Sequence, residues 1–306
     1  MPDIAYVNGT FLDLNDAVIP IDERGHQFGD GIYEVVRVYG GKPFLLHWHI
    51  ERLLRSAAAI RLDGAYSHEK WVELVEQAVQ QSGYAEATVY FQVTRGIAPR
   101  AHLFPNVEPS VTLIVRAHQA KKPTAPQKLL LLPDERWANV YIKTLNLLPN
   151  VLAKQSAYDA GACEALLVRD GQMLEASSAN VWFVKNGELF TAPANRYILP
   201  GITRRYVFEL AEKLGLTLHE QAVPLEKLHE VDEIFLTSTT AEVLAIDEVI
   251  EWPGNIPAKT GLSADIPANV TVTAENCETV WKTGEHVIVK QLQNEFYRSI
   301  NLICAE

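Results

Sequence analysis

Apolar and polar residues alternate along several short segments near the start of the chain, which is the pattern of half-buried β-strands. The alternation from Ile4 to Leu12 is interrupted by Asn8-Gly9, and that from Gly31 to Leu46 by Gly40-Gly41. Dipeptides of this kind accept the left-handed backbone of a type I′ turn, so both segments predict β-hairpins. Two further strands are predicted at residues 87–94 and 111–116.

Helical periodicity replaces alternation at residues 47–60 and 68–81, where apolar positions recur every three or four residues. Ser67 stands where it can cap the second helix, and Gly83 stands just past its end. The same reasoning predicts helices at 150–160, 203–214 and 286–300, strands at 164–168 and 233–238, and a hairpin at 181–191 that turns at Asn186-Gly187.

A polar segment divides the chain. Residues 118–127 (HQAKKPTAPQ) contain two prolines and a lysine pair, which is typical of an interdomain linker. We therefore predict an α+β chain with a lobe at 1–120 and a second lobe at 121–306. The stretch from Glu251 to Gly284 is rich in proline and threonine and has weak periodicity, so it predicts a long loop in the second lobe.

Composition narrows the class of protein. The chain has 306 residues, with 27 basic and 38 acidic side chains and a net charge of −11, which argues against a general nucleic-acid binder. Its apolar runs are much shorter than the roughly 18 residues of a membrane span, and its first residues lack the features of a secretory signal. The three cysteines are scattered and lack metal-ligand spacing. We interpret them as reduced thiols in a cytoplasmic protein.

Lys143 lies in the apolar segment VYIKTLNLL. A lysine in apolar surroundings loses its proton more readily, and the neutral amine can form a Schiff base. From the residues alone, the leading interpretation is an alternating strand with Lys143 pointing to solvent, because lysines are rarely buried unless paired. Glu175 lies just before a predicted strand and has two interpretations: a carboxylate that keeps a heterocyclic nitrogen protonated, or an acidic turn residue.

Two segments could bind an anion. Residues 200–203 (PGIT) lead into a predicted helix, and residues 237–240 (TSTT) follow a predicted strand. Backbone N–H groups and hydroxyls at such places bind phosphate, although Ser and Thr are also ordinary helix caps. The Gly-x-Gly at residues 29–31 opens a hairpin strand instead of a βα unit, which disfavours dinucleotide binding.

Arg100 and His102 form a short basic cluster after a predicted strand. A guanidinium and an imidazole together can bind a carboxylate, but a solvated pair of loop charges fits the spacing as well. His47 and His49 fall on different faces of a helix and have no Cys or acidic partner at ligand spacing, so we predict no metal site. On position alone, Arg52, Tyr33 and Tyr90 are ordinary helix-surface and strand residues.

Taken together and in order, these motifs resemble those of the fold-type IV pyridoxal-phosphate enzymes. The matching segments are RGHQFGDGIYEV (24–35), HIERL (49–53), IKTLNLLPNVLAKQSA (142–157), LEASSANVWF (174–183), ILPGITR (198–204) and LTSTTAEV (236–243). The resemblance extends to about Val249 and resumes weakly in the last helix. Within the family, VYFQVTRGIAPRAH (89–102), with its Arg-x-His element, is most similar to D-amino-acid transaminases. Branched-chain aminotransferases, R-selective amine transaminases and aminodeoxychorismate lyases share the cofactor motifs and remain alternatives.

The resemblance implies a smaller N-terminal α/β lobe, a larger C-terminal lobe with a mixed, barrel-like sheet, and a homodimer. It implies that pyridoxal 5′-phosphate is held as a Schiff base on Lys143 and that the enzyme moves an amino group from a D-amino acid such as D-alanine to a 2-oxo acid. It assigns Glu175 to the pyridine nitrogen. It implies that the cofactor phosphate is bound by residues at the positions of Arg52, Ile202, Thr203, Ser238 and Thr239, with Thr240 beside them. It assigns the substrate carboxylate to Tyr33, Arg100 and His102, the last two supplied by the neighbouring subunit, and places Tyr90 along the pocket.

Overall fold

The computed structural model describes residues 3–63, 65–119, 123, 125–252 and 272–305. They form two compact units. Unit 1 comprises Met1–Lys121, Ile142–Asn146 and Ser299–Glu306, and unit 2 comprises Lys122–Tyr141 and Leu147–Arg298. The chain therefore leaves unit 1 after the N-terminal segment and returns to it twice. The first return is the five-residue segment that carries Lys143.

Unit 1 is built on a six-stranded sheet with the strand order β2-β1-β6-β5-β3-β4, in which every strand pair is antiparallel. Its strands are β1 (Ile4–Val7), β2 (Thr10–Asp13), β3 (Gly31–Tyr39), β4 (Lys42–Pro43), β5 (Ala87–Thr94) and β6 (Ser110–Ala117). Its helices are α1 (Arg24–Phe28), α2 (Leu46–Ala59), α3 (His68–Ser82) and the short 3₁₀ helix η1 (Leu14–Asp16).

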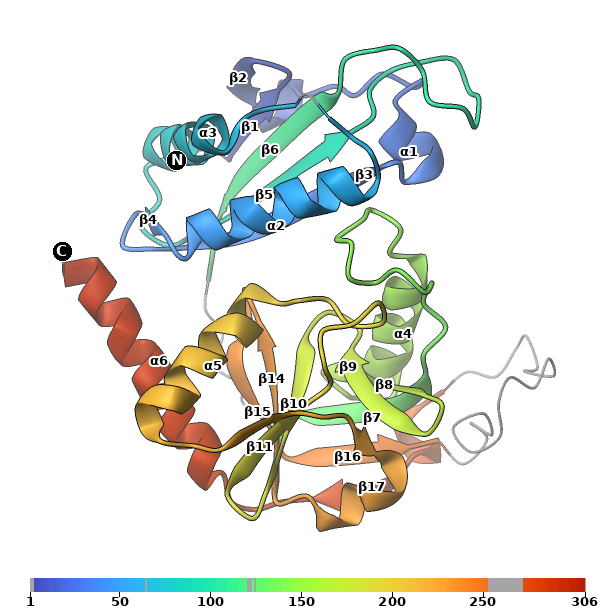
Figure 1. Ribbon diagram of the computed structural model, residues 1–306, viewed down its shortest axis with the longest axis vertical. Helices are drawn as coiled ribbons and strands as arrows, with labels where there is room; N and C mark the ends of the chain where they lie inside the picture. Colours follow the sequence, from blue (N-terminus) through green and yellow to red (C-terminus); the bar gives the residue numbers. More distant parts are fainter. Residues whose placement is uncertain (1–2, 64, 120–122, 124, 253–271, 306) are drawn as a thin grey trace. The chain divides into compact units, whose positions relative to one another are not determined.

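Helices α2 and α3 cover one face of this sheet (Figure 1). The apolar stripe of α2 includes Ile50 and Leu53, and that of α3 includes Trp71; all three are buried against strand residues such as Val36 and Phe91. Successive side chains of a strand point to opposite faces of the sheet, so the residues of β3 and β5 that alternate with these buried ones lie on the other face. That opposite face carries the tyrosines described below.

Unit 2 is built on an eleven-stranded mixed sheet in which β7 pairs in parallel with β8 and β16, β11 pairs in parallel with β12, and the remaining pairs are antiparallel. Its strands are β7 (Lys128–Pro133), β8 (Glu164–Arg169), β9 (Gln172–Ala176), β10 (Asn180–Lys185), β11 (Glu188–Thr191), β12 (Leu218–Glu220), β13 (Val223–Pro224), β14 (Glu233–Ser238), β15 (Glu242–Ile246), β16 (Glu248–Glu251) and β17 (Glu278–Lys282). Its helices are α4 (Leu148–Asp159), α5 (Ile202–Leu214), α6 (Val287–Ala305) and the 3₁₀ helices η2 (Leu225–Glu230) and η4 (Ala274–Asn276).

The core of unit 2 forms where apolar strand residues meet. Leu129, Leu166, Phe183 and Leu236, from four different strands, are fully or almost fully buried in one cluster. Helix α4 packs Ala157 against a second cluster on β7 and β8. Helices α5 and α6 pack against each other through the rings of Tyr206 and Phe296, whose centroids lie 5.7 Å apart. From Ser299 onward, α6 belongs to unit 1.

Several local predictions are confirmed by geometry. Asn8 and Gly9 have φ values of 43° and 102°, as a left-handed turn requires. The Ser67 Oγ accepts a hydrogen bond from the backbone N–H of Lys70 at 3.2 Å, and Gly83 ends α3 with a φ of 65°. The strands at 87–94 and 233–238 have the predicted bounds.

Three predictions need correction. Glu175 lies inside β9 and not before a strand, because β9 and β10 pair on either side of a tight turn. Lys143 lies in an irregular segment of turns and bends that forms a single bridge to the sheet, and not in an alternating strand. The predicted loop at 251–284 contains strand β17, which pairs with β16; residues 253–271 lie outside the described residues. Helix α1 was not predicted because its sequence, RGHQF, is too short to show a period.

No helix in the described part of the chain combines the length and apolar character needed to cross a membrane.

Candidate functional site

Lys143 is held along the edge of β3 by backbone hydrogen bonds. The Tyr33 N–H donates to the Lys143 carbonyl at 3.0 Å, and the Leu145 N–H donates to the Gly31 carbonyl at 3.1 Å. Thr144 bridges to Ile32 in an antiparallel sense, which places Lys143 opposite Tyr33. Opposed residues share a sheet face, and the Lys143 Nζ lies 4.2 Å from the centroid of the Tyr33 ring. A short chain segment thus adds the amine to the face of β3 that carries Tyr33.

Two tyrosines line this face beside the lysine. The rings of Tyr33 and Tyr90 are stacked, with centroids 5.7 Å apart and an interplanar angle of 28°. The Tyr90 hydroxyl donates to the Gln92 Oε1 at 2.7 Å. Burial, together with the neighbouring Tyr33, raises the pKa of Tyr90 to about 12. The Tyr90 hydroxyl therefore keeps its proton at neutral pH, and the amine lies beside an aromatic ring on this face.

On the opposite face of β3, Arg52 and His49 of α2 converge on Glu34. The Arg52 Nε and Nη2 donate to the two Glu34 oxygens at 2.7 and 2.9 Å, and the His49 Nδ1 lies 2.8 Å from Oε2. Burial raises the pKa of Glu34, but Arg52 and His49 lower it more strongly, and it ends well below its usual range. Burial also lowers the pKa of His49, despite the opposing effect of Glu34. Glu34 is therefore ionised, and it fixes the guanidinium of Arg52.

We expect Glu34→Gln to lower the free energy of unfolding at pH 7 by about 3–5 kcal/mol, because a buried arginine loses its counter-charge. Urea denaturation of the purified protein measures this. The matched control is Glu73→Gln, which removes the exposed partner of the exposed Lys70 and should cost less than about 1 kcal/mol. The pKa of Glu34 is lower in the folded protein than in the unfolded chain. The difference in free energy of unfolding between wild type and Glu34→Gln should therefore be fully present above the usual glutamate pKa of about 4.3 and shrink as the pH falls below it. Equal stability of the two variants would contradict a stabilising role for the buried carboxylate.

Arg100 and His102 lie on the exposed loop that follows β5, and both contact Phe28 of α1. The Arg100 Cζ is 4.8 Å from the Phe28 ring centroid, and the His102 ring centroid is 5.5 Å from it. The structure therefore brings together the two residues of the Arg-x-His element, with one aromatic ring as their common support.

In unit 2, Glu175 is a buried carboxylate surrounded by donors. Arg136 forms an ion pair with its Oε1. The Asn180 Nδ2 donates to Oε2 at 2.8 Å, and the Leu199 N–H donates to the same oxygen at 3.2 Å. Burial raises the pKa of Glu175, and the contacts with Arg136 and Leu199 oppose that rise without reversing it. Arg136 is thus the main charge that favours the ionised carboxylate.

Arg136 is itself fixed by a second carboxylate. Its Nε and Nη2 donate to the two oxygens of Asp134 at 2.8 and 2.9 Å, and the Arg169 Nε donates to Asp134 at 3.1 Å. Burial raises the pKa of Asp134, but hydrogen bonds from the two arginines lower it below its usual value. Arg136 therefore presents a permanently charged, immobile group to Glu175.

The candidate anion-binding residues of unit 2 gather at one end of three strands. Asn180 pairs with Glu175 on β9 and with Thr237 on β14, so Ser238 follows directly at that end. Helix α5 begins at Ile202, and its N-cap residue is Gly201. The helix therefore has no capping hydrogen bond from the side chain of its N-cap residue. A Cβ on Gly201 would lie 2.1 Å from the Asn180 Oδ1, so only glycine allows this close approach. The site therefore combines a helix N-terminus with hydroxyl groups.

The hydroxyl residues differ in their surroundings. Thr203, in the first turn of α5, is buried. The Ser238 Oγ accepts a hydrogen bond from the Ala241 N–H at 3.0 Å, which closes the turn that carries Thr239 and Thr240. Its hydroxyl hydrogen can therefore point to another acceptor. The predicted residues thus divide between the units: Lys143, Arg52, Tyr33, Tyr90, Arg100 and His102 belong to unit 1, and Glu175, Ile202, Thr203, Ser238, Thr239 and Thr240 belong to unit 2.

Sequence reasoning missed several residues that the structure joins to the site. Glu34 interrupts the apolar strand sequence IYEVV, and Asn180 precedes the apolar run VWFV. A charged or amide side chain in a strand whose neighbours are buried is a signal of a buried partner. Arg136, by contrast, lies in a polar segment with no such signal, and its pairing with Glu175 is visible only in the structure.

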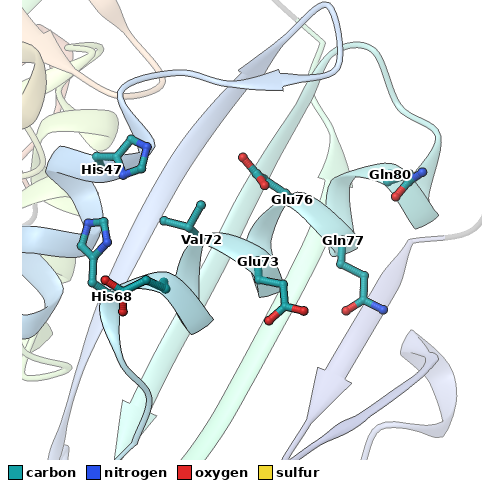
Figure 2. Close-up of a pocket in the computed structure, with 8 residues that line it drawn as sticks. His47, His68, Val72, Glu73, Glu76, Gln77 and Gln80 are labelled. Atoms are coloured by element: carbon teal, nitrogen blue, oxygen red, sulfur yellow. The ribbon is translucent and has the colours of Figure 1, made fainter.

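A surface depression of about 590 Å³ in unit 1 is lined by other residues (Figure 2). His47 of α2 and His68 of α3 stack there, with ring centroids 5.2 Å apart, and glutamates of α3 complete the rim. His47 is exposed and His49 is buried, as expected for different faces of one helix. In the described ranges, no group of three or more His, Cys, Asp or Glu side chains could hold a metal ion. The depression contains none of the predicted site residues.

Comparison with known proteins assigns the chain to a family. The family model "Amino-transferase class IV" matches residues 31–249. This chain belongs to the class IV aminotransferases. Among curated relatives of this aminotransferase, a D-alanine aminotransferase of Bacillus licheniformis is 40% identical over 247 residues, which is 79% of this chain and 87% of that protein. A D-alanine aminotransferase of Listeria monocytogenes is 41% identical over 249 residues, which is 79% of this chain and 86% of the relative.

Solved structures show the same fold as this aminotransferase. The branched-chain aminotransferase of Thermoproteus uzoniensis, crystallised with norvaline, has a TM-score of 0.80 at 23% identity, covering 97% of this chain and 94% of the other. A branched-chain amino acid aminotransferase of Escherichia coli has a TM-score of 0.79 at 22% identity, covering 97% and 94%. The predicted α+β fold of fold-type IV is therefore confirmed. Aminotransferases of this fold type are pyridoxal-phosphate enzymes, and another of the similar branched-chain enzymes was solved with pyridoxamine 5′-phosphate. The substrates of aminotransferases are small amino and oxo acids.

Proposed function

We propose that this aminotransferase moves the amino group of a D-amino acid, such as D-alanine, to a 2-oxo acid. The observation that carries the proposal is the pairing of Arg100 and His102 on the Phe28 ring, which presents a guanidinium and an imidazole as one group of donors for a carboxylate. The D-alanine aminotransferases that are about 40% identical to this chain support the same substrate class.

The residues of the chain fit pyridoxal 5′-phosphate. Lys143 provides a partly buried amine beside aromatic rings. The N-terminus of the 13-residue helix α5 has no side-chain cap and follows a glycine packed against Asn180, which suits a phosphate. Glu175 provides an ionisable carboxylate for a pyridine nitrogen. In this proposal the phosphate is bound by Arg52, Ile202, Thr203, Ser238 and Thr239, with Thr240 beside them.

When bound, the cofactor supplies an electron sink for the bonding electrons of the substrate Cα–H. The Lys143 Nζ accepts the proton from that Cα and later returns a proton as the general acid. As an ionised carboxylate, the form that the ion pair with Arg136 favours, Glu175 keeps its heterocyclic partner protonated. Tyr33, Arg100 and His102 hold the substrate carboxylate, while Tyr90 lines the pocket. Fixing the carboxylate decides which face of Cα meets the lysine, and this selects the D-enantiomer.

In the same proposal the enzyme is a homodimer in which Arg100 and His102 act in the site of the neighbouring subunit. The expectation rests on the family resemblance and on the exposure of both residues in unit 1. We also propose a cytoplasmic location, since Cys163, Cys277 and Cys304 are all free of disulfides.

The experiment is a visible-absorption titration of the purified enzyme, reconstituted with pyridoxal 5′-phosphate, with D-alanine and in parallel with L-alanine. We expect D-alanine to bleach the visible band of the bound cofactor while L-alanine at equal concentration leaves it unchanged, because the fixed carboxylate allows one enantiomer to present its Cα hydrogen to Lys143.

The other outcomes identify the error. Bleaching by L-alanine or L-leucine would retain the aminotransferase and replace the substrate class with that of the branched-chain enzymes. A band that responds to neither enantiomer, together with pyruvate release that needs no amino acceptor, would favour a lyase. A protein that binds no pyridoxal 5′-phosphate would refute the proposed cofactor site.

A further inference from the structure

The loop that carries Arg100 and His102 is held by a buried arginine, Arg24 of α1. The Arg24 Nη1 donates to the carbonyl of Ala101 at 2.6 Å. Ala101 is the residue between Arg100 and His102 in the sequence. The Arg24 side chain is 3% exposed, and its Nε donates to the Asp30 Oδ2 at 2.9 Å. One guanidinium thus connects a carboxylate to the backbone of the loop.

Asp30 connects this contact to the rest of unit 1. Both Asp30 oxygens accept the Arg95 Nε at 3.0 Å. Arg95 donates in turn to the carbonyls of Ile60 and Arg61, at the end of α2, at 2.8 and 2.9 Å. A continuous series of charge-assisted hydrogen bonds therefore runs from α2 through Asp30 and Arg24 to the loop. Hydrogen bonds of this kind are shorter and stronger than neutral ones.

The two ends of the loop are also closed. The Arg24 N–H donates to the Gly96 carbonyl at 3.0 Å. Gly96 has a φ of +95°, and a Cβ there would lie 2.2 Å from the Glu108 carbonyl oxygen. Farther along, Phe104 packs under Arg95, whose Cζ is 3.6 Å from its ring centroid. In Figure 1 this loop, between β5 and β6, extends past the sheet at the end where α1 lies. Arg100 and His102 thus project from a loop with a fixed base.

Phe28 gives Arg24 a second contact with the same residues. The Arg24 Cζ is 4.8 Å from the Phe28 ring centroid, the same distance as the Arg100 Cζ. The ring that supports Arg100 and His102 is therefore packed against Arg24, the group that holds the loop backbone. Loss of the Arg24 guanidinium would release the Ala101 carbonyl and one support of the ring together.

We propose that Arg24, fixed by Asp30, is a positioning residue for substrate carboxylate binding: it sets the place of Arg100 and His102 through the Ala101 carbonyl and the Phe28 ring. The proposal rests on the proposed function, in which Arg100 and His102 bind the carboxylate. Arg24 itself acts through the loop and not on the substrate.

The test compares Arg24→Met with wild type as the pyridoxal-phosphate holoenzyme. Methionine keeps much of the apolar volume and removes both donors. We expect the KM for D-alanine and for pyruvate to rise about 10- to 100-fold, the effect of losing one charge-assisted hydrogen bond, while kcat stays within about threefold. The inhibition constant of propanoate, which has the carboxylate and no amino group, should rise by the same factor as the KM.

The matched control is Arg37→Met. Arg37 is an equally buried arginine of unit 1, paired with Glu86 and with the Ala87 carbonyl, at the far end of β3. Arg37→Met should lose comparable stability in a thermal melt and leave the KM and the propanoate constant unchanged. If Arg24→Met does not fold or does not retain cofactor, Asp30→Asn provides the second variant, since it removes the charge that orients Arg24 at nearly constant volume.

Arg100→Ala separates the inference from the function on which it rests. We expect the effects of Arg24→Met and Arg100→Ala on the propanoate constant to be strongly non-additive, because one acts through the other. If Arg100→Ala weakens propanoate binding and Arg24→Met does not, the positioning role is wrong and the proposed function stands. If neither variant weakens it, the carboxylate assignment and the positioning role are both wrong. Additive effects of the two substitutions on the propanoate constant would also refute the positioning role of Arg24. A fall in the kcat of Arg24→Met as large as the rise in its KM would do the same, because it indicates general damage to the enzyme.

Discussion

Lys143→Ala is expected to reduce transamination to at most about one-thousandth of the wild-type rate, because it removes both the attachment point of the cofactor and the group that moves the Cα proton. General acid–base catalysis alone contributes about 10²–10⁴-fold, and loss of the covalent attachment adds to this. The amine lies 4.2 Å from the Tyr33 ring centroid on a segment fixed to the edge of β3. Steady-state rates with D-alanine and pyruvate measure the effect.

A second measurement is independent of turnover. Borohydride reduction of the holoenzyme followed by peptide mass analysis should show the phosphopyridoxyl group on Lys143 in wild type and on no lysine in Lys143→Ala. The control is Lys185→Ala, at the β10–β11 turn, where the lysine pairs with Glu230; its rate and labelling should equal those of wild type. Labelling at a different lysine, or turnover of Lys143→Ala near the wild-type rate, would assign the chemistry to another residue.

Glu175→Gln is expected to lower kcat by about 10²-fold or more, the scale found when a preorganised electrostatic partner is removed from an active site. Glutamine has nearly the same shape but cannot keep a pyridine nitrogen protonated. It also leaves Arg136 with Asp134 as its remaining partner among the carboxylates described above. We expect the absorption maximum of the bound cofactor to shift as well, which reports the change without turnover.

The matched control for this variant is Glu233→Gln. Glu233 is a buried carboxylate of the same unit, and it accepts the N–H groups of Ile288 and Val289 at 2.9 and 3.0 Å. Its loss should lower the thermal midpoint without changing the cofactor spectrum or the KM. A Glu175→Gln enzyme with wild-type kcat and spectrum would show that Glu175 has only the structural role that Glu233 has.

The order of the motifs was sufficient to predict the fold class. Turns at Asn8-Gly9 and the cap at Ser67 were predicted correctly because they depend on the backbone preferences of one to four neighbouring residues. Prediction from the sequence was less accurate for residues whose structure depends on pairing with another segment of the chain. Glu175 was expected before a strand, and the pairing of β9 with β10 through Asn180 places it inside one.

The sequence by itself determined the local elements and the chemical types of the candidate residues. Only the tertiary structure decided that Lys143 joins unit 1 beside Tyr33, that Arg136 neutralises Glu175, and that Arg24 holds the loop of Arg100. The physical reason is the range of the forces. Backbone conformation is set by near neighbours, whereas a buried charge is stable only when a distant segment brings its counter-charge. The partner of such a charge is therefore determined by the packing of the chain and cannot be read from the residues adjacent to it.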